Sequence, residues 1–491
     1  MLNHPIANMH DLVAGLEPQM NCICQVSGAT GLSASVMSDE KQAYAKHFGF
    51  RDLDAKEAPD GDTTYFIGSV TKGMVAALVG ILVEEKRLSW STRIASILPK
   101  LQDSGARSDG IWISRAGNIL LPKYEGIWTW MAHPIVRDFR SDFLYNNYAY
   151  DIVGRVIEKI ECKSLQETFK VRLWEPLGMH RTYMEDIAGD ANAANAYYAM
   201  EDASSYQVSI PTISHQTIMG AAGAIRSCTN DMAKHYSNFM HAVNHQFHKK
   251  TKSSKLTIQT AHPILRPRNQ LDLISMHEQS YALGWGLAQL PCPLGTLSYN
   301  YLLIPSMPII GKGDPGQLIL YHGGSIQGFN TAVYLLPETE MAIIAMQNSS
   351  GLGDACDWIP QMIIQKLMGS TENIDFQQLA IMAAKAAPKL AENIEAELEK
   401  RRKNGTKPLD IKAYTGCYWN ALCNFHIDVR VHGGRLYMNF QGIENETYEL
   451  RHYHHHSWTW NVSHNETSKQ GRFPTRLWIS YIIEFDCGEK E

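Results

Sequence analysis

The sequence predicts an α/β (α+β) fold in which distant parts of the chain build one sheet, with a large helical insertion between them. Short β-prone segments lie near both ends of residues 30–350, whereas residues from about 90 to 280 are mainly helix-like. From about residue 410, alternation and aromatic residues predict a separate small β-domain, in the form of a barrel. We therefore expect a helical lead over 1–25, a main domain over 26–370, a helical connector over 371–409 and a β-domain over 410–491.

Composition narrows the classes of protein to consider. The chain has 491 residues and a net charge of −5, which fits two or three soluble domains. No basic run suggests a nucleic-acid partner, and no stretch approaches the roughly 18 apolar residues of a membrane helix. The N-terminus lacks the pattern of a secretory signal, so we expect a cytoplasmic protein with no membrane span. The nine cysteines are scattered, which is typical of reduced and mostly buried thiols.

The first strands and helices follow from local patterns. Met9, Leu12, Val13 and Leu16 have helical spacing. Residues 31–37 and 43–50 flank a polar turn and predict a β-hairpin. The next apolar run, 74–83, predicts a buried helix.

Later elements follow the same reasoning. Residues 151–161 and 165–173 read as helices, and another helix is expected near 231–240 after the small residues 220–225. The pattern then returns to strands. These are expected at 281–287, 318–321, 331–336 and 341–346, followed by a helix within 373–403.

A serine and a lysine stand three residues apart before the predicted buried helix. If Ser69 begins this helix, the Lys72 ammonium group can reach its hydroxyl group, because residues i and i+3 share a face. A serine becomes a good nucleophile when a neighbouring base takes its proton, and a lysine can serve if its pKa is lowered. The helix N-terminus also offers N–H groups to an oxyanion. A capping serine followed by a solvated lysine is the alternative explanation.

Two further segments offer partners for this serine. Tyr145 is followed two residues later by the amide of Asn147, and a tyrosinate beside Lys72 could share its proton as general base and acid. A predicted strand runs into His322, Gly323 and Gly324, where glycines let a substrate approach and make room for a large group. His322 could orient a substrate or assist proton transfer. Taken singly, a loop tyrosine and a structural histidine are the simpler explanations.

Together the three segments have the order and spacing of one family. The chain resembles the serine β-lactamase/penicillin-binding-protein superfamily, specifically its class C β-lactamase-like esterases and acyltransferases. Ser69-Val70-Thr71-Lys72 resembles the first motif, Tyr145-Asn146-Asn147 the second and His322-Gly323-Gly324 the third. Segments 48–52, 174–179, 223–225, 283–286 and 336–338 also fit, so the resemblance covers about residues 25–370. The remainder is similar to the extra domain of fungal β-lactamase-like proteins.

The resemblance implies a β-lactamase/transpeptidase-like antiparallel sheet flanked by helices, and a serine acyl enzyme. Ser69 would attack a carbonyl group, Lys72 with Tyr145 would accept its proton, and the N–H groups of Ser69 and Ser325 would hold the oxyanion. The expected substrate-binding residues are Asn147, His322, Gly323, Gly324 and Ser325. The substrate would be an ester, thioester, lactone or amide of a small molecule, with a carrier-protein thioester as one candidate, in fungal-type polyketide or terpenoid metabolism. A catalytically silent binding protein and a true β-lactamase or D-aminopeptidase are the alternatives.

Two departures from the family pattern qualify this expectation. Trp112-Ile113-Ser114-Arg115-Ala116-Gly117 stands where the family has a histidine-containing segment. His322 and Gly323 replace lysine and threonine, which weakens recognition of a β-lactam carboxylate. We expect no cofactor and no metal, because the histidines at 452 and 454–456 have no carboxylate or cysteine at a closing spacing. The pattern does not predict an oligomeric state.

Overall fold

The computed structural model describes most of the chain. It covers residues 6–99, 101, 106–107, 119–138, 143–185, 189–251, 257–258, 261–267, 269–271, 275–370, 372–473 and 477–486. The altered family segment at 112–117 lies outside these described residues. No helix in the described ranges is long and apolar enough to cross a membrane.

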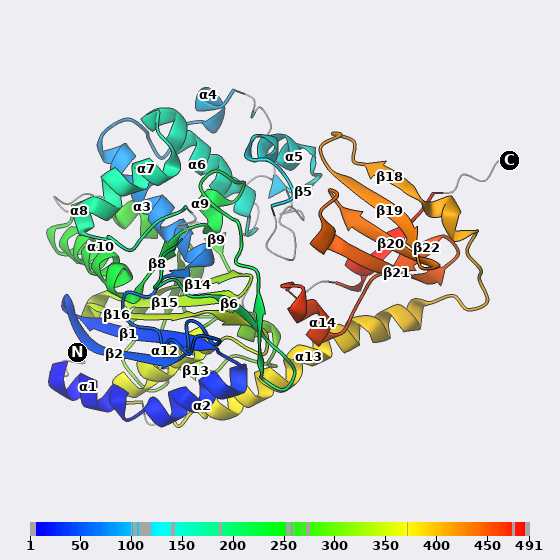
Figure 1. Cartoon of the computed structure of the whole chain (residues 1–491). Helices are drawn as coiled ribbons and strands as arrows, with labels where there is room; N and C mark the ends of the chain where they lie inside the picture. The colour runs from blue at the N-terminus through cyan, green and yellow to red at the C-terminus, as the bar shows by residue number, and fades with distance from the viewer. Residues whose placement is uncertain are drawn as a thin grey trace.

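An eight-stranded antiparallel sheet forms the centre of the larger part of the molecule (Figure 1). Its strand order is β2-β1-β16-β15-β14-β11-β10-β9. The strands are β1 (Gly31–Ser38), β2 (Lys41–Gly49), β9 (Asn269–Gln270), β10 (Gln279–Tyr281), β11 (Gly286–Gln289), β14 (Leu318–Ile326), β15 (Phe329–Leu336) and β16 (Met341–Gln347). The distant parts of the chain meet where β1 pairs with β16, with Leu32 opposite Gln347. The predicted sheet of distant segments is therefore confirmed.

Alternation along the central strands divides the apolar residues between two cores. On β16, Met341, Ile343 and Ala345 pack on one side of the sheet, whereas Ala342 and Ile344 pack on the other. A strand places successive side chains on opposite faces, so a strand buried on both faces is apolar throughout. Helices must therefore cover both faces.

Helices of the predicted insertion cover the face that carries the candidate site. They are α6 (Asn147–Glu161), α7 (Leu165–Phe169), α9 (Gly220–Gly223) and α10 (Thr229–Lys249), and the central helix α3 (Thr71–Glu84), which precedes the insertion, packs with them. The opposite face is covered by α1 (Ile6–Ala14), α2 (Glu17–Ser27), α12 (Ala355–Leu367) and α13 (Phe376–Arg401) (Figure 1). The expected N-terminal lead thus consists of two helices that are built into the second core, because Met20 and Ile23 are fully buried there.

The larger part of the molecule also contains short strands that the sequence did not predict. β6 (Ala196–Ala199), β7 (Ser205–Val208) and β17 (Ser349–Ser350) form one small sheet. The pairs β3 (Tyr65–Phe66) with β8 (Arg226–Ser227), β4 (Ala106–Arg107) with β5 (Ile135–Arg137), and β12 (Cys292–Pro293) with β13 (Ile309–Ile310) form three more. Segments of two to four residues are too short to show the periodicity that distinguishes a strand from a helix. The remaining short helices are α4 (Ile94–Ile97), α5 (Gly126–Ala132), α8 (Glu175–Leu177), α11 (His262–Leu265) and α14 (His464–Lys469).

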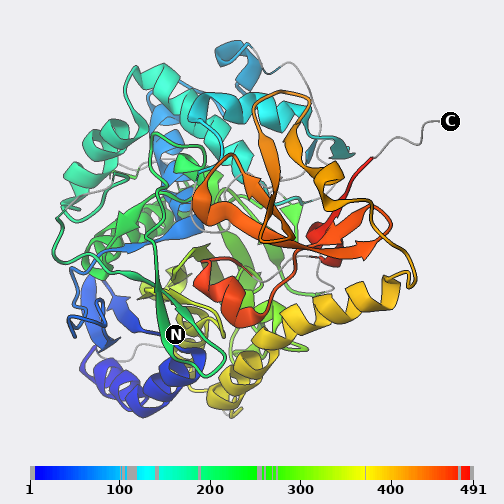
Figure 2. The same cartoon turned by 45° about the vertical axis from the view of Figure 1, so that its right-hand side comes forward.

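The C-terminal residues form a second antiparallel sheet with its own core (Figure 2). Its strands run in sequence order as β18 (Gly416–Trp419), β19 (His426–His432), β20 (Arg435–Phe440), β21 (Thr447–His454), β22 (Ser457–Thr459) and β23 (Ile482–Glu484). The sheet is a half-barrel: the Tyr418 ring on β18 lies 5.4 Å from the Phe485 ring just after β23. Ile394 and Leu398 near the end of α13 belong to this core, so the helix joins the two parts.

Direct hydrogen bonds connect the C-terminal sheet to the helical insertion of the larger part of the molecule. Asn424 Nδ2, in the loop between β18 and β19, donates to Glu125 Oε2 (2.9 Å) and Thr129 Oγ1 (3.0 Å). Gln441 Nε2 donates to the Leu120 carbonyl oxygen (2.9 Å). These three hydrogen bonds reach α5 and the residues just before it, which precede Tyr145 in the sequence.

Candidate active site

The serine lies in a tight turn that leads directly into the central helix. Ser69 is the middle residue of a 3₁₀ turn, Gly68–Val70, and α3 begins at Thr71 rather than at Ser69. Because the turn continues into the helix, Lys72 still faces the serine. Its Nζ donates to Ser69 Oγ (3.0 Å) and to the Ala222 carbonyl oxygen on α9 (2.8 Å).

Lys72 is completely inaccessible to solvent, with 0% of its surface exposed. Its Nζ lies 4.9 Å from the centre of the Tyr145 ring and 5.4 Å from that of Tyr150. An ammonium group loses its hydration when it is buried, so it needs polar or aromatic partners. The turn at Ser69, α9 and the residues around the start of α6 supply them. Ser69 itself is half-buried, so its hydroxyl group is the more accessible member of the pair.

The start of α6 fixes the position of Tyr145. Asn146 is the N-cap, and its side-chain oxygen accepts a hydrogen bond from Ala149 N (2.9 Å). Asn147 is the first residue of the helix and is half-buried, as is Tyr145. The Tyr145 ring lies 6.1 Å from that of Tyr281 and 6.3 Å from that of His322.

His322 is buried, with 2% of its surface exposed, and both of its ring nitrogens have protein partners. Nδ1 lies 2.6 Å from the Gly323 carbonyl oxygen, and Nε2 lies 2.9 Å from Tyr281 Oη. Because a carbonyl oxygen only accepts, Nδ1 carries the proton and Nε2 accepts from the Tyr281 hydroxyl group. Burial, and after it the positive charge of Lys72, lowers the pKa of His322 to about 3, which keeps the imidazole neutral.

Tyr281 and Tyr150 extend this arrangement beyond the residues that the motifs indicated. Burial raises the pKa of both phenols. The Tyr281 hydroxyl group hydrogen-bonds to His322, and the Tyr150 ring lies beside Lys72 Nζ. No motif pointed to Tyr281, because its contact with His322 spans β11, which lies between β10 and β14 in the sheet.

Glycines bring the end of β14 directly against the serine turn. A Cβ atom on Gly324 would clash with the Ile67 carbonyl oxygen, and one on Gly68 would lie 2.7 Å from Ser325 N. Gly68 also has φ of +51°, which favours glycine. A Cβ atom on Gly323 would clash with the Leu297 carbonyl oxygen. The room at Gly323 and Gly324 is therefore occupied by the protein's own backbone, and the expectation that it accommodates a large substrate group is wrong.

Ser325 follows these glycines and is exposed. Its Oγ donates to Asn330 Oδ1 (2.7 Å) across the β14–β15 pair. The close approach of Gly68 to Ser325 N brings the backbone of β14 to the turn that holds Ser69. The structure thus gathers Ser69, Lys72, Tyr145, His322 and Ser325 from three separate segments, as the motifs predicted.

Fold and site together define a protein of the penicillin-binding-protein type, with a serine–lysine pair at the start of the central helix. The chain belongs to the beta-lactamase family, whose model matches residues 21–111 and 123–365. The model of a domain of unknown function, DUF3471, matches residues 400–491. The predicted family resemblance is confirmed.

Known proteins resemble the chain at low identity. Unguisins hydrolase ungD from Aspergillus violaceofuscus is 25% identical over 439 residues, covering 79% of this chain and 72% of that protein. Unguisins hydrolase ungD' from Aspergillus campestris is 23% identical over 354 residues, covering 65% and 58%. The octameric penicillin-binding protein homologue from Pyrococcus abyssi has a TM-score of 0.57 and 19% identity, covering 92% of this chain and 94% of that one. The last likeness shows the fold.

Proposed function

We propose that this chain is a serine hydrolase that forms an acyl-enzyme on Ser69. The observation that carries the proposal is the 3.0 Å contact between Lys72 Nζ and Ser69 Oγ, because a buried amine at that distance can take the hydroxyl proton. Membership of the beta-lactamase family supports it, and so do relatives that are named hydrolases.

The proposed reaction has two similar halves. Ser69 Oγ attacks the carbonyl carbon of an ester, thioester, lactone or amide as its proton passes to the Lys72–Tyr145 pair, in which one of the two groups has already given up its proton. The carbonyl electron pair moves onto oxygen, where the N–H groups of Ser69 and Ser325 stabilise it. When the carbonyl re-forms, the bond to the leaving group breaks, and Lys72 with Tyr145 supplies its proton. Water then attacks the acyl-enzyme in the same way and releases the acid.

His322 enters this proposal as a positioning residue. Its two nitrogens hold the Gly323 carbonyl oxygen and the Tyr281 hydroxyl group. A neutral imidazole offers no fixed cation to a substrate carboxylate, so we propose a largely uncharged acyl group. Substrate contact is then left to Asn147, Ser325 and the backbone beside Gly323 and Gly324.

Substrate and acceptor are proposed from the relatives. Their names favour water as acceptor over an alcohol or a carrier thiol, and a secondary metabolite as substrate. The unguisins are accordingly the first compounds to test, ahead of polyketide or terpenoid esters. A location in the cytoplasm remains part of the proposal.

Labelling of Ser69 tests the proposal. A fluorophosphonate should add one phosphonyl group to the wild-type chain, seen as an intact-mass shift, and Ser69→Ala should remain unlabelled. Ser91→Ala is the matched control: it removes an exposed serine beyond the far end of α3 and should label normally. Absence of labelling in the folded wild type would favour the silent binding protein, and labelling of Ser69→Ala would exclude Ser69 as the nucleophile.

Comparison of substrates separates this proposal from a true β-lactamase. We expect kcat/KM for nitrocefin to fall below that for the best ester, thioester or amide, because no lysine stands at position 322. Nitrocefin turnover at least as efficient would return the chain to the β-lactamase alternative.

A further inference from the structure

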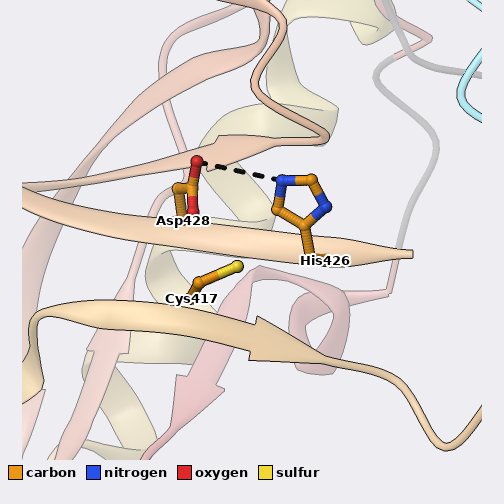
Figure 3. Close-up of side chains that lie close together, drawn as sticks. All are labelled: Cys417, His426 and Asp428. Atoms are coloured by element: carbon orange, nitrogen blue, oxygen red, sulfur yellow. Dashed lines mark ion pairs between the residues drawn. The ribbon is translucent and has the colours of Figure 1, made fainter. Parts of the chain in front are cut away.

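The C-terminal sheet carries a cluster of three potential metal ligands (Figure 3). Cys417 lies on β18, and His426 and Asp428 lie on β19. Cys417 is directly opposite Asp428 in the strand register, and His426 is two residues away from Asp428 on the same strand. Period-two alternation therefore places all three side chains on one face of the sheet.

The distances suit one small ion. The Cys417 sulfur, a ring nitrogen of His426 and a carboxylate oxygen of Asp428 all lie within 4.8 Å of one another. His426 Nε2 is 3.8 Å from Asp428 Oδ2, which is too long for a hydrogen bond. Two ligand atoms at about 2.0–2.3 Å from a tetrahedral Zn²⁺ ion lie slightly closer to each other than His426 Nε2 lies to Asp428 Oδ2. A modest inward movement of the cysteine would complete the set.

The surroundings hold the imidazole in place. The Trp419 ring, opposite His426 in the register, packs against it with ring centres 4.5 Å apart. The neighbouring Asn424 is hydrogen-bonded to α5, and the His426 backbone N–H donates to Gln441 Oε1 (2.8 Å). The ligand on β19 is therefore anchored by the same contacts that join the two parts of the molecule.

Other charged groups face the cluster. Arg430 Nη2 lies 2.9 Å from Asp428 Oδ2, but 74% of the Arg430 side chain is exposed, so this pair is readily exchanged for solvent. Desolvation and the Asp428 carboxylate raise the pKa of the Cys417 thiol. Without a cation the thiol keeps its proton, which disfavours a role as a nucleophile.

We propose that Cys417, His426 and Asp428 bind a divalent transition-metal ion of the Zn²⁺ class, with water as the fourth ligand. Thiolate, imidazole and carboxylate together select borderline metals such as Zn²⁺ over Mg²⁺ or Ca²⁺. The ion joins β18 to β19 at the base of the loop that contacts α5.

A second cluster provides the contrast. Asp39, His241 and Glu340 also lie within 4.8 Å of one another, but this cluster contains no sulfur. Both His241 nitrogens already face carboxylates, Glu40 at 2.9 Å and Glu340 at 3.7 Å. These interactions already occupy the imidazole, so His241 serves as a control.

Cobalt titration of the metal-stripped full-length chain tests the proposal. We expect one Co²⁺ per chain, with the thiolate-to-cobalt charge-transfer absorption in the near ultraviolet, and displacement of Co²⁺ by Zn²⁺. Cys417→Ser should abolish that absorption. His426→Gln and Asp428→Asn should weaken binding by more than the roughly 10–100-fold that loss of an outer partner costs.

Matched variants keep the test decisive. Cys423→Ser removes another exposed cysteine of the same hairpin, and His241→Gln disrupts the second cluster; both should leave cobalt binding unchanged. Arg430→Gln should tighten it, because it releases the carboxylate. Circular dichroism checks folding, and Asp428→Asn preserves side-chain shape if Cys417→Ser does not fold. No stoichiometric binding by the wild type, or unchanged absorption in folded Cys417→Ser, would overturn the proposal.

Discussion

The two antiparallel sheets of this protein place their polar side chains in opposite settings. Beside the eight-stranded sheet, Lys72 is fully buried and His322 nearly so, and both are held by several partners. In the half-barrel, Cys417 is exposed on the edge strand β18 and its neighbours on β19 are half-buried. A buried, preorganised group suits proton transfer, because solvent does not compete for it. An open cluster suits an exchangeable ligand.

The largest expected effect on kcat comes from changing one side-chain atom in each of the two settings and comparing the results. Ser69→Ala should lower kcat by about four orders of magnitude or more, because the nucleophile is lost. Cys417→Ser should leave kcat within about threefold, because Cys417 lies on β18 of the C-terminal sheet and not among the residues around Ser69. The kcat for the best substrate, measured at steady state for the wild type and for each variant, checks both predictions. Full activity of Ser69→Ala would refute the assignment of the nucleophile.

A glycine-to-alanine substitution on one strand of each sheet tests how closely β14 packs against the serine turn. Gly324→Ala should lower the free energy of unfolding by about 1–3 kcal/mol, because its Cβ would clash with the Ile67 carbonyl oxygen. It should also reduce kcat by about 10²-fold by displacing the oxyanion donors. At Gly416, on β18, a Cβ atom would meet only the Tyr418 ring at 3.6 Å. Gly416→Ala should therefore change stability by less than about 1 kcal/mol. Equal losses would contradict the close approach of β14 to the turn.

The pH dependence of stability tests the burial of His322. Its pKa is lowered to about 3 by burial, whereas an unfolded histidine titrates near 6.5. Below about pH 6.5 the unfolded chain binds one proton more at this residue, so its contribution to stability falls as the pH decreases. The stability of the wild type relative to His322→Gln should drop by about 1.4 kcal/mol per pH unit below 6.5. A pH-independent difference in denaturant unfolding would show that His322 is not held neutral.

Tyr281→Phe tests the hydrogen bond that holds His322. Loss of the donor should leave Nε2 without its partner, at a cost of about 1–3 kcal/mol in stability, and reduce kcat by about tenfold. Tyr321→Phe is the matched control, because Tyr321 is a buried phenol bonded to Thr296 (2.6 Å) among residues of the other core. It should lose similar stability and keep its kcat. If both variants lose the same activity, Tyr281 has no special role.

The sequence was sufficient for the parts of the fold that depend on pattern. The short β-prone segments near both ends of residues 30–350 predicted one sheet built from distant parts of the chain, and the apolar run at 74–83 predicted the central helix. The three motifs predicted which segments meet, because their order and spacing are shared by a family. Tyr281 could not be found in this way, since its distance from His322 depends on strand order across β11. The role of Gly323 was also hidden, because a missing side chain looks the same whether backbone or substrate fills the space.

The smallest expected effect concerns the contact between the two parts of the molecule. Asn424 donates to Glu125 and Thr129 on the side of the molecule that leads to Tyr145, so Asn424→Ala removes two interfacial hydrogen bonds without touching either cluster. A typical hydrogen bond contributes about 0.5–1.5 kcal/mol, and a partly exposed one lies at the lower end. We expect kcat to change by less than about threefold, with a small loss of thermal stability. If the half-barrel instead shapes the catalytic site through this loop, kcat will fall well beyond that limit, and the separation of the two settings will no longer hold.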